Sequence, residues 1–312
     1  MKLPRDLLLM IVFLLAASPL SGCYYLSSES VPEVSNYELG LAELRTLARS
    51  RPGDLPIEVR LERVGTTELP GALMMAGRSW DGVEMTHVVF QIVWPDATFV
   101  LIDSAQDREM HESTPGSAPF DGEAWDTIVD AMDGAEQIVI THEHPDHLGG
   151  AARHPRPEVL ASNLRLSEEQ LANQETLEAI DFPATLLEKL TPLIFDDALA
   201  IAPGVVLKKA PGHTPGSQMV FVTLADGREL LFVGDVVWNL DAITELLYRP
   251  RLITDLVIGE DREAAIHQLR ALRDLYDEGE VAIVVSHDQR THASAAIEHG
   301  FSLPSRTAVV AQ

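Results

Sequence analysis

Short apolar runs that end in histidine or aspartate are the feature that most restricts how this chain can fold. "EQIVIT" (136–141) leads directly into "HEHPDH" (142–147), "RELLFVGD" (228–235) ends in aspartate, and "EVAIVVSHD" (280–288) ends in histidine and aspartate. Apolar runs of this length are typical of buried strands. Side chains just beyond such strands lie in loops, where binding and catalytic residues are concentrated. The pattern predicts several strands whose ends meet at one polar site.

The remaining elements indicate a layered α/β sandwich, because runs of strands are followed by helices alternating with strands. Asp121 is expected to cap the helix that follows it. The predicted strands are 57–65, 85–94, 97–105, 136–141, 204–210, 217–225, 228–235 and 280–288. The predicted helices are 37–49, 121–132, 164–173, 183–190 and 261–277.

Composition and charge limit the class of partner. The chain has 312 residues, 46% of them hydrophobic, which is enough to bury a large core. Its formal net charge of −25 repels phosphate backbones at long range. We therefore expect a small-molecule substrate and no nucleic-acid partner. Lys208 and Lys209 lie on a predicted strand and are expected to face solvent.

The N-terminal segment indicates export. A short basic stretch precedes "LLLMIVFLLAAS", an apolar run of 12 residues that is too short to span a bilayer comfortably. "LSGC" (20–23) then resembles the lipobox of bacterial lipoproteins, and Cys23 is the only cysteine. The resemblance implies a signal peptide at 1–22, a membrane anchor at a lipidated Cys23, and a location in the periplasm or at the cell exterior. Tyr24 in place of aspartate favours the outer membrane. A cleaved secretory signal or an uncleaved anchor is the alternative.

Seven side chains at the strand exits are candidate metal ligands. Neutral imidazole and carboxylate groups suit zinc, and two cations need more donors than one short segment supplies. His142 and His144 are placed to reach one cation, with Asp146 and His147 directed towards a second. The complete candidate set is His142, His144, Asp146, His147, His213, Asp235 and His287.

Together, "THEHPDH", "GHTPG", "VGD" and "SHD" resemble the metallo-β-lactamase superfamily over roughly residues 57–290. The resemblance implies a four-layer αββα sandwich, with the hydrolase domain at 56–312. The polar segment at 23–55, with its scattered prolines, predicts a tether and a short helix. It also implies a first cation held by His142, His144 and His213, and a second held by Asp146, His147 and His287. Asp235 would bind both, and Asp103 would orient a ligand histidine. Glu143 should point away from the cations.

The implied cofactor is a pair of zinc ions, with manganese or iron as possible substitutes, around a water of lowered pKa. Asp146 would act as the catalytic proton acceptor. Asp235 argues against a true β-lactamase, and "PGHTPGS" with "SHD" favours the lactonase branch, which opens acyl homoserine lactones. Phosphodiester or thioester (glyoxalase II-like) hydrolysis and a metal-loaded binding scaffold remain alternatives, and the oligomeric state stays open. The lactonase branch often carries a tyrosine near the metals, and Tyr248 is the candidate for it. Trp238 and Leu240 are candidates for an acyl pocket, with buried packing as the alternative.

Overall fold

The computed structural model describes residues 19–303, and these form two β-sheets stacked face to face. Residues 1–18, which hold most of the predicted signal peptide, lie outside the described residues. The first sheet has the order β11-β1-β2-β3-β4-β5. Its strands are β1 Glu58–Pro70, β2 Gly82–Val93, β3 Phe99–Ile102, β4 Gln137–Val139, β5 Leu164–Arg165 and β11 Glu298–His299.

The second sheet has the order β10-β9-β8-β7-β6. Its strands are β6 Ala198–Ala202, β7 Val205–Lys209, β8 Gln218–Thr223, β9 Glu229–Phe232 and β10 Ala282–Val284. The chain passes from the first sheet to the second after β5 and returns to the first at β11. Each sheet mixes parallel and antiparallel pairs: β3 and β4 run parallel, as do β9 and β10.

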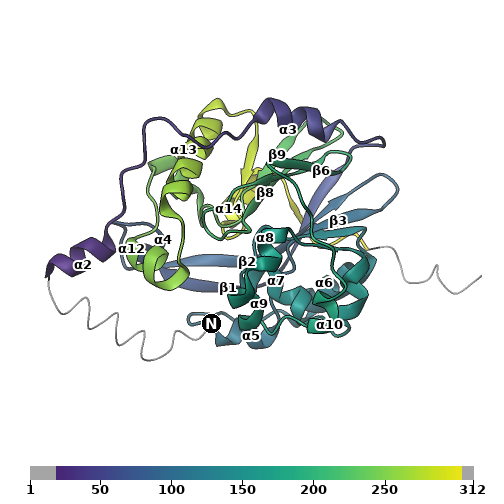
Figure 1. Ribbon diagram of the computed structural model, residues 1–312, viewed down its shortest axis with the longest axis horizontal. Coiled ribbons are helices and arrows are strands. Elements are labelled where there is room, and N and C mark those ends of the chain that lie inside the picture. Colours follow the sequence, from purple (N-terminus) through teal and green to yellow (C-terminus); the bar gives the residue numbers. More distant parts are fainter. Residues whose placement is uncertain (1–18, 304–312) are drawn as a thin grey trace, which may run out of the picture.

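Helices cover the outer faces of both sheets. Figure 1 shows α3 and α13 over the second sheet, with α6 and α10 on the opposite side of the molecule. The α-helices are α2 Pro19–Leu26, α3 Leu41–Ala48, α4 Gly71–Met74, α5 Arg108–Ser113, α6 Gly122–Gly134, α7 Pro145–Ala152, α8 Glu168–Ala172, α9 Gln174–Ala179, α10 Ala184–Leu187, α11 Leu240–Glu245, α12 Arg251–Ile253, α13 Arg262–Glu278 and α14 Gln289–Ser294. A 3₁₀ turn spans Pro157–Ser162, and a π-helical turn spans Thr254–Ile258.

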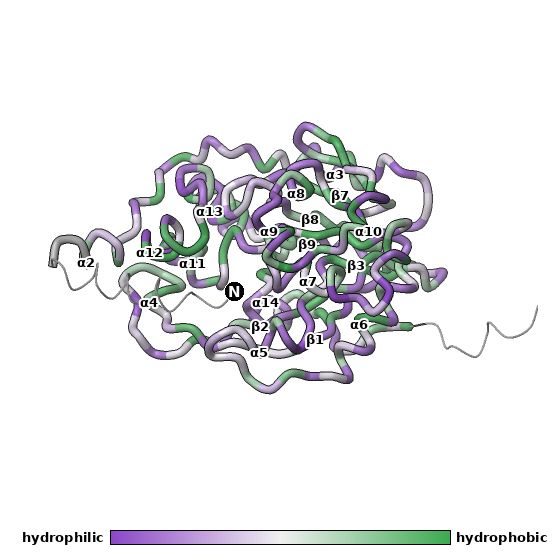
Figure 2. Tube along the Cα trace, turned by 60° about the horizontal axis from the view of Figure 1, so that its bottom comes forward, coloured by the Kyte–Doolittle hydropathy of each residue, from purple (hydrophilic) through white to green (hydrophobic). Residues whose placement is uncertain are grey.

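Three hydrophobic layers hold these elements together. The layer between the sheets includes Phe90 of β2 and Phe232 of β9, whose ring centroids are 4.9 Å apart. Outside the first sheet, Ile128 of α6 packs with residues of β3 and β4, and outside the second, Leu269 of α13 packs with residues of β7 and β8. Figure 2 shows the hydrophobic colouring concentrated in the central strands and the hydrophilic colouring in the outer loops. The predicted αββα sandwich is confirmed.

Most of the predicted elements are present, and their ends have identifiable caps. The Asp121 carboxylate accepts hydrogen bonds from the backbone N–H groups of Glu123 and Ala124, so the predicted cap of α6 is confirmed. The predicted helix at 164–173 is partly wrong, because its first residues form β5 and only Glu168–Ala172 is helical.

The prediction that Lys208 faces solvent is wrong. Its side chain is only 4% exposed, and its ammonium group donates to both carboxylate oxygens of Asp197 at 2.5 and 2.6 Å. The Tyr37 ring lies 5.5 Å from the same ammonium group. Because β7 has neighbours on both sides and the N-terminal segment covers its outer face, this lysine is buried and paired instead of facing solvent.

The segment after Cys23 docks against the loop region that contains α12. The Arg251 backbone N–H donates to the Ser27 carbonyl at 3.1 Å, and the Arg251 guanidinium lies 4.8 Å from the centre of the Tyr24 ring. Cys23 itself is exposed in α2. Among the helices of residues 19–303, none is long and apolar enough to cross a membrane.

Candidate metal centre

The candidate centre lies where loops leave four strands of the two sheets. His142 follows β4 by three residues, Asp235 follows β9 by three, and His287 follows β10 by three. His213 lies in the turn between β7 and β8. Gly234 has a φ of +51°, and a Cβ there would lie 2.9 Å from Thr141 Cβ, so the turn before Asp235 requires glycine.

Helix α7 begins inside the histidine motif and presents its first turn to the centre. His144 is the residue before the helix, Pro145 occupies the first helical position, and Asp146 and His147 follow. Gly150 lets the helix approach the loop after β3, because a Cβ at this position would lie 1.9 Å from the Ser104 carbonyl oxygen. This contact fixes where Asp146 and His147 point.

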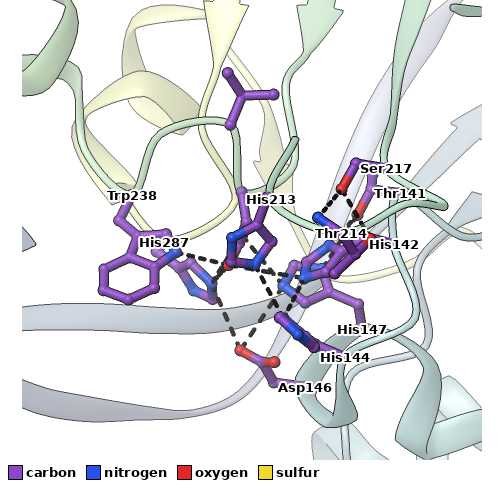
Figure 3. Close-up of polar contacts among 12 residues, drawn as sticks. Thr141, His142, His144, Asp146, His147, His213, Thr214, Ser217, Trp238 and His287 are labelled. Atoms are coloured by element: carbon purple, nitrogen blue, oxygen red, sulfur yellow. Dashed lines mark hydrogen bonds and ion pairs between the residues drawn. The ribbon is translucent and has the colours of Figure 1, made fainter. Parts of the chain in front are cut away.

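Three histidines form the first group. His144 Nδ1 lies 3.2 Å from His142 Nε2 and 2.9 Å from His213 Nε2. Figure 3 shows the three rings converging from the α7 loop and the β7–β8 turn. Their ligand atoms all lie within 4.8 Å of one another, close enough to share a single cation.

Asp146, His147 and His287 gather beside this group. Asp146 Oδ2 is 3.5 Å from His287 Nε2 and 3.7 Å from His147 Nε2. The Asp146 side chain is 24% exposed, whereas those of His147 and His287 are 3% and 2% exposed. The centre is therefore deeply buried on most sides and open to solvent beside Asp146.

Asp235 lies between the two groups. Its Oδ1 faces the second group, and its Oδ2 lies near both groups, since it is also 3.3 Å from His287 Nε2. Its Oδ2 is 3.5 Å from His213 Nε2 and 3.8 Å from His142 Nε2. Its Oδ1 is 3.1 Å from His287 Nε2 and 3.3 Å from His147 Nε2. The Trp238 indole N–H also donates to Oδ2 at 2.7 Å, which fixes the rotation of the carboxylate.

In three histidines, the ring nitrogen that points away from the centre, Nδ1, donates a hydrogen bond to a neighbouring acceptor. His147 Nδ1–H donates to Asp103 Oδ2 at 2.8 Å, so the structure places Asp103 where sequence reasoning expected it. His213 Nδ1–H donates to Glu260 Oε1 at 2.7 Å, and His287 Nδ1–H donates to the Thr86 carbonyl at 2.7 Å. Such outer hydrogen bonds fix the tautomer that leaves Nε2 free to bind a metal.

Burial and mutual charge set the protonation states. Burial lowers the pKa of His142 and His213 well below the ordinary histidine value, and neighbouring histidines lower it further. Burial opposes ionisation of Asp235, but His287 and His147 outweigh it and hold its pKa well below the usual range. The first group therefore consists of neutral imidazoles, and Asp235 is ionised, as cation binding requires.

Two buried atoms show that the residues fit divalent cations. His147 Nε2 and Asp235 Oδ1 are both buried, and neither has a hydrogen-bond partner within the described part of the chain. Leaving such groups unpaired in a protein interior is costly. Imidazole and carboxylate donors in this number suit Zn²⁺ and related first-row metals.

The remaining candidates differ in their positions. The buried Glu143 points away from the centre, and its carboxylate accepts hydrogen bonds from Asn173 Nδ2 and Thr214 Oγ1 at 2.7 and 2.8 Å. The Tyr248 hydroxyl donates to Glu260 Oε2 at 2.9 Å, so this tyrosine contacts the centre through Glu260 and His213. Trp238 packs with Met74, Met85 and Ile253 in a small apolar cluster.

Sequence reasoning missed two residues. Glu260 follows Gly259 after the π-helical turn, and nothing in "VIGED" distinguishes it from an ordinary helix-capping acid. His87 lies inside β2, and its Nδ1 is 3.4 Å from Asp146 Oδ2. His87 sits well inside its strand instead of at the strand's end, so the pattern that identified the other histidines does not include it.

Comparison with known proteins identifies the fold family. Residues 136–287 match the family model described as the metallo-beta-lactamase superfamily. The chain is 25% identical over 162 residues to the N-acyl homoserine lactonase AiiA of Bacillus thuringiensis subsp. kurstaki and to an N-acyl homoserine lactonase of Bacillus thuringiensis. Each match covers 51% of this chain and 58% of the relative.

Solved structures share the architecture. An N-acyl homoserine lactone hydrolase with N-hexanoyl-L-homoserine bound at its catalytic metal center has a TM-score of 0.60 at 15% identity, covering 77% of this chain and 96% of that one. AidC, described as a dizinc quorum-quenching lactonase, has a TM-score of 0.54 at 15% identity, covering 75% and 88%. Residues 136–287 therefore match a metallo-beta-lactamase superfamily domain, and the solved structures share its αββα fold.

Proposed function

We propose that this protein is a metal-dependent hydrolase that opens ester-type bonds, with acyl lactones as its substrates. The observation that carries the proposal is Asp235, whose carboxylate lies between two groups of histidine ligand atoms. A carboxylate buried between two such groups is what a pair of cations needs as a shared ligand. The named activities of the relatives support the lactone assignment.

The distances between the side chains divide the residues into two proposed cation sites. His142, His144 and His213 would hold the first cation, and Asp146, His147 and His287 the second, with Asp235 shared. Zinc is the proposed metal, since AidC is described as a dizinc lactonase and imidazole groups outnumber carboxylates among the proposed ligands. When bound, the two cations would supply Lewis acidity and lower the pKa of a nearby water.

Asp146 is the residue best placed to move a proton. It is the most exposed acid of the centre, and its Oδ2 faces the space shared with His147 and His287. A water entering from solvent reaches this carboxylate before the deeper Asp235, which is 5% exposed. We assign Asp146 to accept the proton of the attacking water and return it to the departing alcohol.

The apolar cluster beside the centre supports a substrate with an acyl chain. Met74, Met85, Trp238 and Ile253 are buried together, and partly buried residues including Leu73, Val257 and Ile258 pack against them. Trp238 links this cluster to Asp235 through its indole N–H. An acyl chain lying along the partly buried Leu73, Val257 and Ile258 would bring its lactone carbonyl towards the cation sites.

The test is a comparison of three substrates. Purified protein loaded with zinc is assayed with an acyl homoserine lactone, an acyl thioester and bis(p-nitrophenyl) phosphate. We expect the lactone to be hydrolysed fastest, with rates that rise with acyl-chain length. A thioester or phosphodiester rate that equals the lactone rate would contradict the lactone assignment. Cation binding without turnover of any of the three would favour the alternative of a binding scaffold.

We further propose that Cys23 is lipidated and anchors the protein to a membrane. "LSGC" ends at this residue, and its side chain is exposed next to the polar segment that leads into the fold. Mass spectrometry of the protein extracted from a bacterial envelope should show a diacylglyceryl modification at Cys23. An unmodified Cys23 would contradict this, and Cys23→Ser should release the protein from the membrane fraction.

A further inference from the structure

His87 is a buried histidine whose side chain faces the second group of candidate ligands. Its Nδ1 lies 3.4 Å from Asp146 Oδ2, and the ligand atoms of His87, Asp146 and His287 all lie within 4.8 Å of one another. Strand β2, which carries His87, is hydrogen-bonded to a proposed ligand, because the carbonyl of the preceding Thr86 accepts a hydrogen bond from His287 Nδ1–H. His87 is therefore held at the centre by the sheet itself.

The environment of its two ring nitrogens matches that of the proposed ligands. The outer nitrogen, Nε2, contacts Thr67 Oγ1 at 3.1 Å. The inner nitrogen, Nδ1, is buried and has no hydrogen-bond partner among residues 19–303. His147 shows the same arrangement, with Asp103 bonded to its outer nitrogen and an unpartnered inner nitrogen. A buried imidazole nitrogen left unpaired costs free energy unless a ligand occupies it.

The distances also fit a shared cation. Donor atoms that each lie about 2.1 Å from one metal are about 3 to 3.5 Å apart. Asp146 Oδ2 is 3.4 Å from His87 Nδ1 and 3.5 Å from His287 Nε2, so the two histidines approach this carboxylate equally closely. Judged by its distance to Asp146 Oδ2, His87 is therefore as well placed to be a ligand as His287.

We propose that His87 binds the second cation through Nδ1 as an additional protein ligand. The inference rests on the proposed dinuclear centre and adds to it. The second site would then have five protein donors, His87, Asp146, His147, Asp235 and His287, and the first site four. Five donors exclude tetrahedral coordination, so the second site would select a cation that accepts five or six ligands.

The competing role for His87 is to donate a hydrogen bond from Nδ1–H that orients Asp146. The two roles differ in which nitrogen carries the proton. A ligand has its proton on Nε2, donated to Thr67 Oγ1, and its ring sits within bonding distance of the metal. A paramagnetic metal separates the roles, because it strongly shifts the N–H signal of every histidine bound to it.

The experiment is proton NMR of the full-length protein substituted with Co²⁺, recorded in H₂O and in D₂O. We expect six exchangeable, strongly shifted N–H signals, from His87, His142, His144, His147, His213 and His287. His87→Gln should give five, together with more intense visible Co²⁺ absorption, as coordination number falls. Its affinity for the second Co²⁺ should drop about 100-fold.

His111→Gln is the matched control. His111 is also buried, and its ring lies 5.6 Å from that of His87, but its Nε2–H donates to the Ala118 carbonyl at 2.8 Å. This variant should keep all six signals and the parent absorption. Thr67→Val is a second test that leaves His87 in place, and it should move one of the six signals and weaken second-site binding.

Different results would overturn different claims. Five shifted signals in the wild type, unchanged in His87→Gln, would overturn the His87 assignment and leave the dinuclear centre intact. Fewer than two bound Co²⁺ in the wild type would overturn the dinuclear centre, and the His87 assignment with it.

Discussion

Glu260 supports His213 from behind, and other buried groups hold Glu260 in turn. Arg249 Nη2 lies 2.8 Å from Glu260 Oε1, and the Tyr248 hydroxyl donates to Oε2 at 2.9 Å. Both side chains are buried, so the network is largely shielded from solvent. A network of this kind fixes a ligand ring more firmly than any one of its bonds would.

Glu260→Gln tests this network at the scale of one residue. The amide cannot accept the His213 hydrogen bond with a full negative charge, so His213 becomes a weaker and less oriented donor. We expect cation affinity to fall about 10- to 100-fold, measured by competition with a chelator. Glu143→Gln is the control, because Glu143 is equally buried but faces Asn173 and Thr214. Equal affinities in the two variants would contradict the role of Glu260.

Asp235→Ala tests the shared carboxylate. The change removes the group that faces His213 on one side and His287 on the other. We expect the variant to lose at least one cation and most of its hydrolytic activity, measured by metal analysis and by lactone hydrolysis. A variant that retains both cations and full activity would remove Asp235 from the ligand set.

The seven proposed ligands were accessible to sequence reasoning because each follows an apolar run or a Gly/Pro turn. Glu260 and His87 were not accessible in this way. Glu260 reaches His213 across a distance of 47 residues, and His87 reaches Asp146 from the interior of a neighbouring strand. Both contacts depend on how elements far apart in the chain are arranged in space, which local sequence patterns do not report.

At the scale of elements, α7 is the piece that positions half of the histidine motif. Its first turn carries Asp146 and His147, and its glycines lie against the loop after β3. The Ser104 hydroxyl donates to the His147 carbonyl at 2.9 Å, and the Ser104 backbone N–H donates to the same carbonyl at 2.8 Å. Moving this helix would therefore move two proposed ligands together.

The substitution Gly150→Ala should move helix α7. The added methyl group would lie 1.9 Å from the Ser104 carbonyl oxygen, so the helix must shift away from the loop. We expect a destabilisation of about 1–3 kcal/mol in denaturant unfolding, together with weaker binding of the second cation. Gly134→Ala is the control, because its methyl group would meet Phe99 at an ordinary contact distance of 3.5 Å. A Gly150→Ala protein as stable as the control would contradict the close-packing argument.

The long strands and amphipathic helices were predictable, whereas some of the short elements were not. Helix α13 has a regular apolar face and an Asp261 cap, and it forms close to its predicted limits. Ala198–Ala202 forms β6 without having been predicted, because its small residues carry a weak strand signal. It becomes a strand by pairing with β7, so its structure depends on a neighbour.

At the scale of the whole molecule, the centre joins the two sheets. Loops after the first sheet supply His142, His144, Asp146 and His147, and loops of the second supply His213, Asp235 and His287. Separating the sheets would therefore dismantle both cation sites. Cations that bind only the folded protein should stabilise it, and a chelator should lower its melting temperature.

Acid should destabilise the protein partly through His292, which is buried against Phe90. Burial lowers the pKa of His292 to about 4. The unfolded chain binds this proton near pH 6.5 and the folded protein does not, so stability is intact above pH 6.5 and falls between pH 6.5 and 4. The loss attributable to this group is about 3 kcal/mol.

His292→Gln should remove this contribution. Its unfolding free energy, measured against pH with the cations chelated, should fall less steeply than that of the parent between pH 6.5 and 4. The other buried histidines are common to both proteins, so the difference between the two curves isolates His292. Parallel curves would contradict the assignment.

The most direct test of the dinuclear centre is the number of divalent cations bound per chain. Metal-free protein is titrated with Zn²⁺, and the bound metal is measured by elemental analysis after removal of free ions. The arrangement of two histidine groups around Asp235 predicts saturation at two zinc ions per chain. Saturation at one, or no binding, would contradict it.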